Sequence, residues 1–183
     1  GIIDGDGGLV KSGSGSLTLT QTNIYQGPTT ITAGSLIVDG SLGSDVTVGS
    51  GATLTGLGSV GSVINNGTVS PSDFEGVFTI NGDYTSPGTT LVDVNPNASS
   101  HVTVTGIANI NKSTLSVDVV PGELNAYEGR GPFEVLSSNN PIQGQFGAVQ
   151  SSYVRYKWTA DYATDPNKVF LNFDGHVSFE EIV

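Results

Sequence analysis

Apolar side chains along this chain recur in short runs that alternate with polar ones, a pattern typical of β-strands. The runs are rich in Val, Ile, Leu and Thr and are interrupted by Gly, Asn, Ser or Asp. Side chains of a strand point alternately to opposite faces, so each run places one side chain inward and the next outward. Only Glu123–Arg130 and the tail from Val177 could form even a short helix. We predict strands at Ser16–Thr20, Ser35–Asp39, Asp45–Val48, Ala52–Thr55, Val77–Ile80, Thr90–Val94, Val102–Thr105 and Thr114–Val117.

The predicted strands repeat at intervals of about 20 residues. Self-similarity at this interval, carried by short strands, is typical of a β-solenoid, whose rungs bury apolar side chains against one another. A β-sandwich is the alternative, because it also has short strands separated by turns. The repeats that favour the solenoid are Gly15-Ser-Leu17 with Gly34-Ser-Leu36 (19 residues apart), Leu36 with Leu54 (18 apart), Thr79-Ile80 with Thr103-Val104 (24 apart) and Thr90-Leu91 with Thr114-Leu115 (24 apart).

The last third of the chain is rich in aromatic side chains. Of the 14 aromatic residues, 10 follow Pro121. Between Val154 and Trp158, large apolar residues alternate with Arg155 and Lys157, and between Val169 and Phe173 they occupy every second position. Asp165-Pro-Asn-Lys168, which lies between these two stretches, is rich in residues that favour turns. This pattern predicts a β-hairpin whose apolar face contains Val154, Tyr156, Trp158, Val169, Leu171 and Phe173.

We therefore predict an all-β chain that folds as a right-handed parallel β-helix (a β-solenoid). The end of a solenoid exposes strand edges and core, which a cap must cover. The aromatic hairpin, or a sandwich-like region containing it, is the expected C-terminal cap. The predicted division is residues 1–120 for the rungs and residues 121–183 for the cap.

Composition and charge narrow the function. The 26 glycines fit turns that need positive φ. A net charge of −11 with only six basic residues argues against nucleic-acid binding and against an anionic membrane surface. The chain has no Cys, so disulfides and thiolate metal sites are excluded. It has no Met and begins at Gly1, and we interpret it as a processed piece of a longer chain.

No set of residues predicts catalysis. The two histidines, His101 and His176, lie near serines or acids, but no nucleophile-elbow motif accompanies them. Neither zinc-ligand spacing nor a complete calcium loop is present. We therefore expect no enzyme, no metal and no cofactor.

The order of motifs resembles the C-terminal passenger region of Gram-negative type V autotransporters. The first half is similar to the passenger-associated transport repeat, and the second half to the autochaperone or junction segment. The repeat-like motifs are Gly7-Gly-Leu-Val-Lys11, Gly15-Ser-Leu-Thr-Leu19, Asn23-Ile-Tyr-Gln-Gly27, Thr29-Thr-Ile31, Gly34-Ser-Leu-Ile-Val38, Leu54-Thr-Gly-Leu-Gly58 and Asn65-Asn-Gly-Thr-Val-Ser-Pro71. The junction-like motifs are Gly82-Asp-Tyr84, Phe133-Glu-Val-Leu136, Gly144-Gln-Phe146 and Val169-Phe-Leu-Asn-Phe173.

The resemblance implies a role in folding. It implies that residues 121–183 emerge first at the cell surface and nucleate the β-helix, which supports translocation across the outer membrane. Trp158 with Asp174 also resembles an actin-recruiting, virulence-associated member of the family. Trp158 is either part of this nucleus or an ordinary core aromatic. Asp174, which precedes Gly175, is either a turn residue or the partner of a folding-critical hydrogen bond. The folding-critical candidates are Trp158, Asp174, Tyr84, Tyr156, Phe146 and Phe173.

The resemblance also implies partners and a location. The expected partners are the protein's own upstream rungs and a C-terminal membrane β-barrel that this chain does not contain. The expected location is the bacterial cell surface or outer membrane, with release as a secreted passenger as a variant. The alternative function is a binding surface for adhesion, self-association or a host protein such as a cytoskeletal component.

Overall fold

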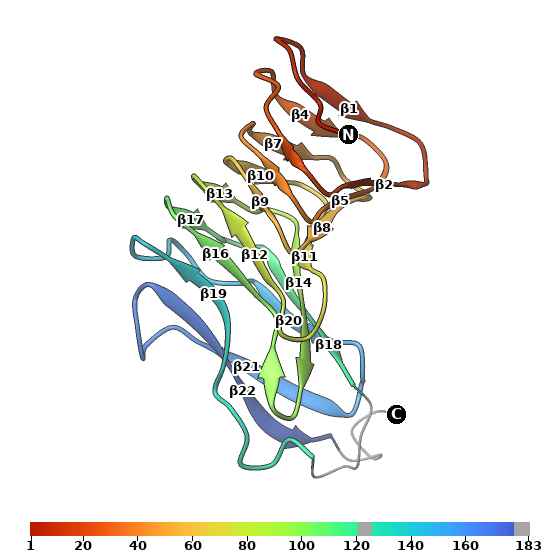
Figure 1. Cartoon of the computed structure of the whole chain (residues 1–183). Coiled ribbons are helices and arrows are strands. Elements are labelled where there is room, and N and C mark those ends of the chain that lie inside the picture. Colours follow the sequence, from red (N-terminus) through yellow and green to blue (C-terminus); the bar gives the residue numbers. More distant parts are fainter. Residues whose placement is uncertain (121–125, 178–183) are drawn as a thin grey trace.

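The computed structural model describes residues 1–120 and 126–177 and shows a parallel β-helix of three sheets. The chain winds from one sheet to the next, so three successive strands make one rung (Figure 1). Short strands with branched apolar side chains suit this fold, because each must pack on the rung before and the rung after. The described residues contain strands, turns and bends and no helix, and none of them could cross a bilayer as a helix.

The first sheet contains six parallel strands, one from each rung. They are β1 (Leu9–Lys11), β4 (Thr29–Ile31), β7 (Val46–Val48), β10 (Val63–Asn65), β13 (Tyr84–Thr85) and β17 (Ala108–Asn109). The second sheet contains β2 (Ser16–Leu19), β5 (Gly34–Val38), β8 (Ala52–Gly56), β11 (Thr68–Pro71), β14 (Thr89–Asn95), β18 (Thr114–Val119) and β20 (Ala148–Ser151), with β15 (Ala98–Ser99) folded back on β14.

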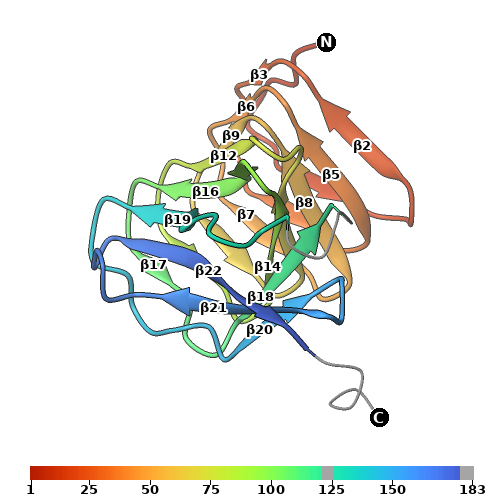
Figure 2. The same ribbon diagram turned by 90° about the horizontal axis from the view of Figure 1, so that it is seen from below.

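The third sheet begins with parallel strands and ends with an antiparallel hairpin. Its strands in spatial order are β3 (Thr22–Asn23), β6 (Ser41–Leu42), β9 (Ser59–Val60), β12 (Val77–Ile80), β16 (His101–Val104), β19 (Phe133–Ser138), β22 (Lys168–His176) and β21 (Tyr156–Asp161). Viewed along the solenoid axis, β21 and β22 cross the C-terminal end of the coil (Figure 2). The predicted hairpin is confirmed: Asp165 accepts the backbone N–H of Asn167 at its turn.

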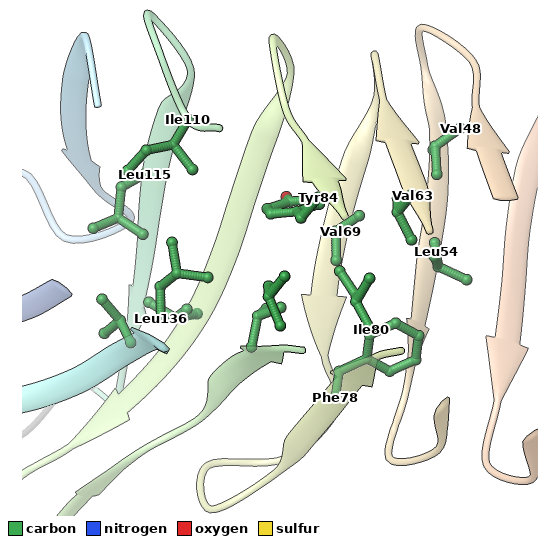
Figure 3. Close-up of a cluster of buried hydrophobic side chains, with 14 of the residues drawn as sticks. Val48, Leu54, Val63, Val69, Phe78, Ile80, Tyr84, Ile110, Leu115 and Leu136 are labelled. Atoms are coloured by element: carbon green, nitrogen blue, oxygen red, sulfur yellow. The ribbon is translucent and has the colours of Figure 1, made fainter. Parts of the chain in front are cut away.

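The core is one continuous column of apolar side chains (Figure 3). In the second sheet Leu17, Leu36 and Leu54 occupy equivalent positions of successive rungs, which confirms the predicted intervals of 19 and 18 residues. The interval of 24 is also confirmed for Thr79, which pairs with Thr103. Rungs stacked about 4.8 Å apart thus bury their Leu, Ile and Val side chains against those of their neighbours.

The predicted interval between Thr90 and Thr114 is wrong by one residue. Thr90 pairs with Leu115, and Thr114 pairs with Thr89. Three residues separate β13 from β14, whereas four separate β17 from β18. The longer turn contains Lys112 in the left-handed region (φ 65°), and it shifts the register so that Leu115 points inward.

In the described residues the one segment that could have formed a short helix does not form it, and one residue of the predicted hairpin face is wrong. Residues 126–129 form a turn, closed by a hydrogen bond from the Arg130 N–H to the Tyr127 carbonyl, where a short helix could have formed. Residues 123–125 of that segment and the tail beyond Val177 lie outside the described residues. Val154 is exposed rather than on the apolar face of the hairpin, because β21 begins only at Tyr156.

Candidate functional site in the aromatic cap

Aromatic side chains from the hairpin and from the chain before it meet at the C-terminal end of the core. Trp158 is 6% exposed, and its ring centroid lies 5.1 Å from that of Phe173 and 5.3 Å from that of Tyr127. Phe133 lies 6.1 Å from Trp158 at an interplanar angle of 68°. Edge-to-face pairs of this kind add stability beyond the area that they bury. We call Tyr127, Phe133, Tyr156, Trp158 and Phe173 the aromatic cap.

Tyr156 connects the aromatic cap to the outer end of the hairpin. Its ring lies 5.3 Å from Tyr127, 5.6 Å from Phe173 and 4.8 Å from Tyr153. It also packs on His176, at 5.3 Å. The hairpin therefore presents its three predicted aromatic residues to one cluster, as alternation along β21 and β22 requires.

Tyr127, which the sequence analysis did not nominate, joins the aromatic cap to the rungs. Its side chain is fully buried, and its hydroxyl lies 3.0 Å from the Val94 carbonyl and 3.1 Å from the Val120 carbonyl. Val94 is the second-last residue of β14, and Val120 directly follows the neighbouring strand β18. One phenol thus fixes two rungs against the cap.

Burial raises the pKa of Tyr127 to about 12, with the nearby Tyr156 adding to the effect. The folded chain therefore favours the neutral phenol, and this contribution to stability is complete below pH 10 and disappears as the pH rises through 12. We expect the free energy of unfolding of the parent chain to fall between pH 10 and pH 12. That of Tyr127→Phe should fall less over the same range. At pH 7 this variant should lose about 0.5–1.5 kcal/mol, because the hydroxyl no longer donates to the Val94 and Val120 carbonyls, although the Val94 carbonyl still accepts the Val120 backbone N–H.

The measurement is urea unfolding followed by circular dichroism at several pH values. Tyr153→Phe is the matched control, since Tyr153 is 37% exposed and should change neither value. Equal stability of Tyr127→Phe and the parent chain at pH 7 would contradict the assigned role of the hydroxyl.

Asp174 lies inside β22, so the first of its two alternatives, a turn residue, is wrong. Lys157 pairs with Gly175 and Trp158 with Phe173, which leaves Asp174 as the extra residue of a β-bulge. Gly175 adopts φ 108°, a conformation that glycine reaches without steric cost. The Asp174-Gly175 dipeptide therefore forms a bulge within a strand. The Asp174 carboxylate is exposed and accepts a hydrogen bond of 3.1 Å from the Thr159 hydroxyl, across the hairpin.

The other two candidates lie away from the aromatic cap. The Phe146 side chain packs against the edge of the core, and its backbone N–H donates to the Tyr162 hydroxyl at 2.9 Å. Tyr84 is fully buried in the fifth rung, where its hydroxyl contacts Thr90 at 2.8 Å and accepts a bond from the Asn65 amide at 3.2 Å. Burial raises the pKa of Tyr84. The structure therefore unites Trp158, Tyr156 and Phe173 and separates them from Phe146, Tyr84 and Asp174.

Neither histidine belongs to a catalytic arrangement in the part of the chain that is described. His101 lies near Glu134, but that carboxylate forms an ion pair of 2.7 Å with Lys168. The hydroxyls of Ser99 and Ser100, next to His101, bond to backbone groups of Glu134 and Asp93. No group of three acidic or imidazole side chains is placed to hold a metal ion within residues 1–120 and 126–177.

Comparison with known proteins supports an autotransporter passenger. Residues 9–38, which span β1 to β5, match the passenger-associated-transport-repeat family. The chain is 29% identical over 170 residues to an extracellular serine protease of Serratia marcescens, covering 87% of this chain and 16% of that protein. It is 41% identical over 78 residues to the adhesin BmaC autotransporter of Brucella suis biovar 1, covering 39% of this chain and 2% of that protein.

Proposed function

We propose that this chain is the C-terminal part of the passenger of a type V autotransporter and that residues 121–183 nucleate the folding of its β-helix. The matched repeat and the two similar proteins support the passenger assignment. The observation that carries the nucleation role is the cluster of aromatic side chains at the C-terminal end of the solenoid. At this end the parallel strands of the third sheet give way to the antiparallel hairpin, and the aromatic cap closes the core.

A cap at the C-terminal end can give folding a direction. A rung gains most of its stability from its neighbours, so the first rung to form has no template and is the most difficult. Aromatic side chains that bury about 150–250 Å² each can provide the missing contacts. Once the cap and the sixth rung are in place, β18 presents an edge on which β14 can form, and each later rung repeats this step toward the N-terminus.

The same stepwise growth can support export. At about 0.05–0.15 kcal/mol per residue, a rung of about 20 residues contributes roughly 1–3 kcal/mol once it is formed. Every rung completed outside the membrane therefore disfavours backward movement of the chain. In this proposal the protein acts at the cell surface or after release, and its partners are its own upstream rungs and the translocator domain of the same protein.

A finer proposal concerns virulence. Trp158 at the centre of the aromatic cap and Asp174 in the bulge are the residues that resemble an actin-recruiting member of the family. In the structure Trp158 is buried and Asp174 forms a cross-strand hydrogen bond. These surroundings support a role in folding that is shared by passengers, and recruitment of host cytoskeletal proteins would require other parts of the passenger.

A binding surface is the second candidate function, because one similar protein is named an adhesin. The outward face of the third sheet presents Thr or Ser at one position of each rung, which gives a neutral surface of hydrogen-bonding groups. This column consists of Thr22, Ser41, Ser59, Thr79, Thr103 and Ser137. Capture of a partner by the isolated chain would favour this function over nucleation.

The folding role is tested in the complete protein by deleting residues 121–183 and measuring the protease resistance of the passenger at the cell surface. We expect resistance to be lost, and to return in part when residues 121–183 are supplied as a separate chain. Deletion of a stretch of equal length from the first three rungs should leave the remaining rungs resistant. A resistant passenger without residues 121–183 would overturn the proposal.

A further inference from the structure

A groove follows the corner between the third and first sheets across the first four rungs. It has a volume of about 480 Å³ and is lined from Thr22–Gln26 in the first rung, Ser41–Ser44 in the second, Ser59 in the third and Asn81 in the fourth. The corner lengths account for its shape. Five residues separate β3 from β4, three separate β6 from β7, and two separate β9 from β10. The long first corner adds Ile24, which is 50% exposed, and Gln26 to one end of the groove.

The floor of this corner groove is held rigidly by side chains that are already hydrogen bonded. The Tyr25 hydroxyl contacts that of Thr29, which lies 2.8 Å from the Ser44 hydroxyl. The Asn23 amide donates to the Gln21 carbonyl at 2.8 Å and accepts the Ile3 N–H at 2.9 Å. A ligand would therefore meet a preformed surface and would lose little affinity to the ordering of these groups.

The rim of the corner groove carries four polar side chains that form no hydrogen bond with any described residue: Thr22, Ser41, Ser59 and Asn81. Thr22, Ser41 and Ser59 are register partners in successive rungs, and Asn81 follows two residues after Thr79, the partner of Ser59. Each of the first four rungs thus offers one solvent-accessible polar side chain, at intervals of about 4.8 Å along the axis. Hydroxyl and amide groups both donate and accept hydrogen bonds, as the hydroxyls of a sugar do.

The electrostatic surroundings disfavour an anionic ligand. No charged side chain lines the corner groove, and the chain as a whole carries a net charge of −11. Anionic ligands would be repelled by this field and would find no basic partner. Ile24, which is half exposed, provides apolar contact for the C–H groups of a ring. We propose that the corner groove binds a neutral oligosaccharide lying parallel to the solenoid axis, a role that does not depend on nucleation by the cap.

The test is titration of the ¹⁵N-labelled 183-residue chain with maltotriose, cellotriose and mannotriose, which represent three neutral sugar geometries. At least one should shift the amide signals of residues 22–26, 41–44, 59 and 81 and saturate in the millimolar range. Asn81→Ala and Ser41→Ala should each weaken binding about fivefold, the effect of one lost hydrogen bond. Thr103→Ala is the matched control, since Thr103 belongs to the same hydroxyl column but lies outside the groove.

Three results would overturn the proposal. The first is the absence of shifts with all three neutral sugars at tens of millimolar. The second is an equal response to trigalacturonate, the anionic comparison, which would show that the groove does not select against charge. The third is an equal loss of affinity in Thr103→Ala, which would place binding on the hydroxyl column as a whole.

Discussion

Replacing Trp158 by alanine is expected to lower the free energy of unfolding of the chain by about 3–5 kcal/mol, the usual cost of deleting a buried large aromatic side chain. The indole is surrounded by Tyr127, Phe133 and Phe173, so the cavity that remains cannot be filled without moving several rings. In the complete passenger we expect the same substitution to reduce folding and surface yield. Urea unfolding of the chain and protease resistance on cells measure the two effects.

Kinetics separate a nucleating Trp158 from an ordinary core aromatic. If the aromatic cap forms in the transition state, Trp158→Ala should mainly slow folding. Phe78→Ala is the matched control, because Phe78 is also fully buried but lies in the fourth rung, and it should mainly speed unfolding. An unchanged folding rate in Trp158→Ala, with wild-type protease resistance, would refute nucleation by the cap.

A charge placed in the second rung should have a large but local effect. Leu36 is fully buried between Leu17 and Leu54, so Leu36→Asp places a carboxylate in the core without a partner. Because each rung contacts only its neighbours, we expect the first two rungs to lose their structure while the aromatic cap and later rungs stay folded. Hydrogen exchange resolved by strand measures this directly.

The neighbouring position supplies the control for this prediction. Ile37 lies on the same strand but faces outward, between Thr18 and Thr55, so Ile37→Asp should leave exchange nearly unchanged. Loss of protection in β19 and β22 in Leu36→Asp would show that the solenoid unfolds as a single unit, and directional growth from the cap would then be wrong.

Much of the fold could be predicted from the sequence, because strand periodicity and rung interval are both local features. The strand Val77–Ile80 has the predicted bounds, and Leu17, Leu36 and Leu54 stack as the interval requires. The register error at Thr90 arises from one added residue in the turn before Thr114, and a repeat defined by two letters is too short to reveal such an insertion.

The candidate site was only partly predictable. Alternation along the hairpin is enough to place Tyr156, Trp158 and Phe173 on one face. Tyr127 was missed because it lies in a turn without periodicity, and one of its two hydrogen-bond partners, the Val94 carbonyl of β14, lies 33 residues earlier in the chain. A turn was one of the two alternatives for Asp174 because Asp-Gly is common in turns, whereas the pairing of β21 with β22 places the same dipeptide in a bulge.

The order in which strands gain protection during refolding tests nucleation by the cap most directly. The complete 183-residue chain is diluted from urea, and its amides are labelled by pulsed hydrogen exchange at increasing times. We predict that amides of β19, β21 and β22 are protected first and that protection then spreads through β18 and β14 toward β1, β2 and β3. Protection of the first rungs before β21 and β22 would contradict this account.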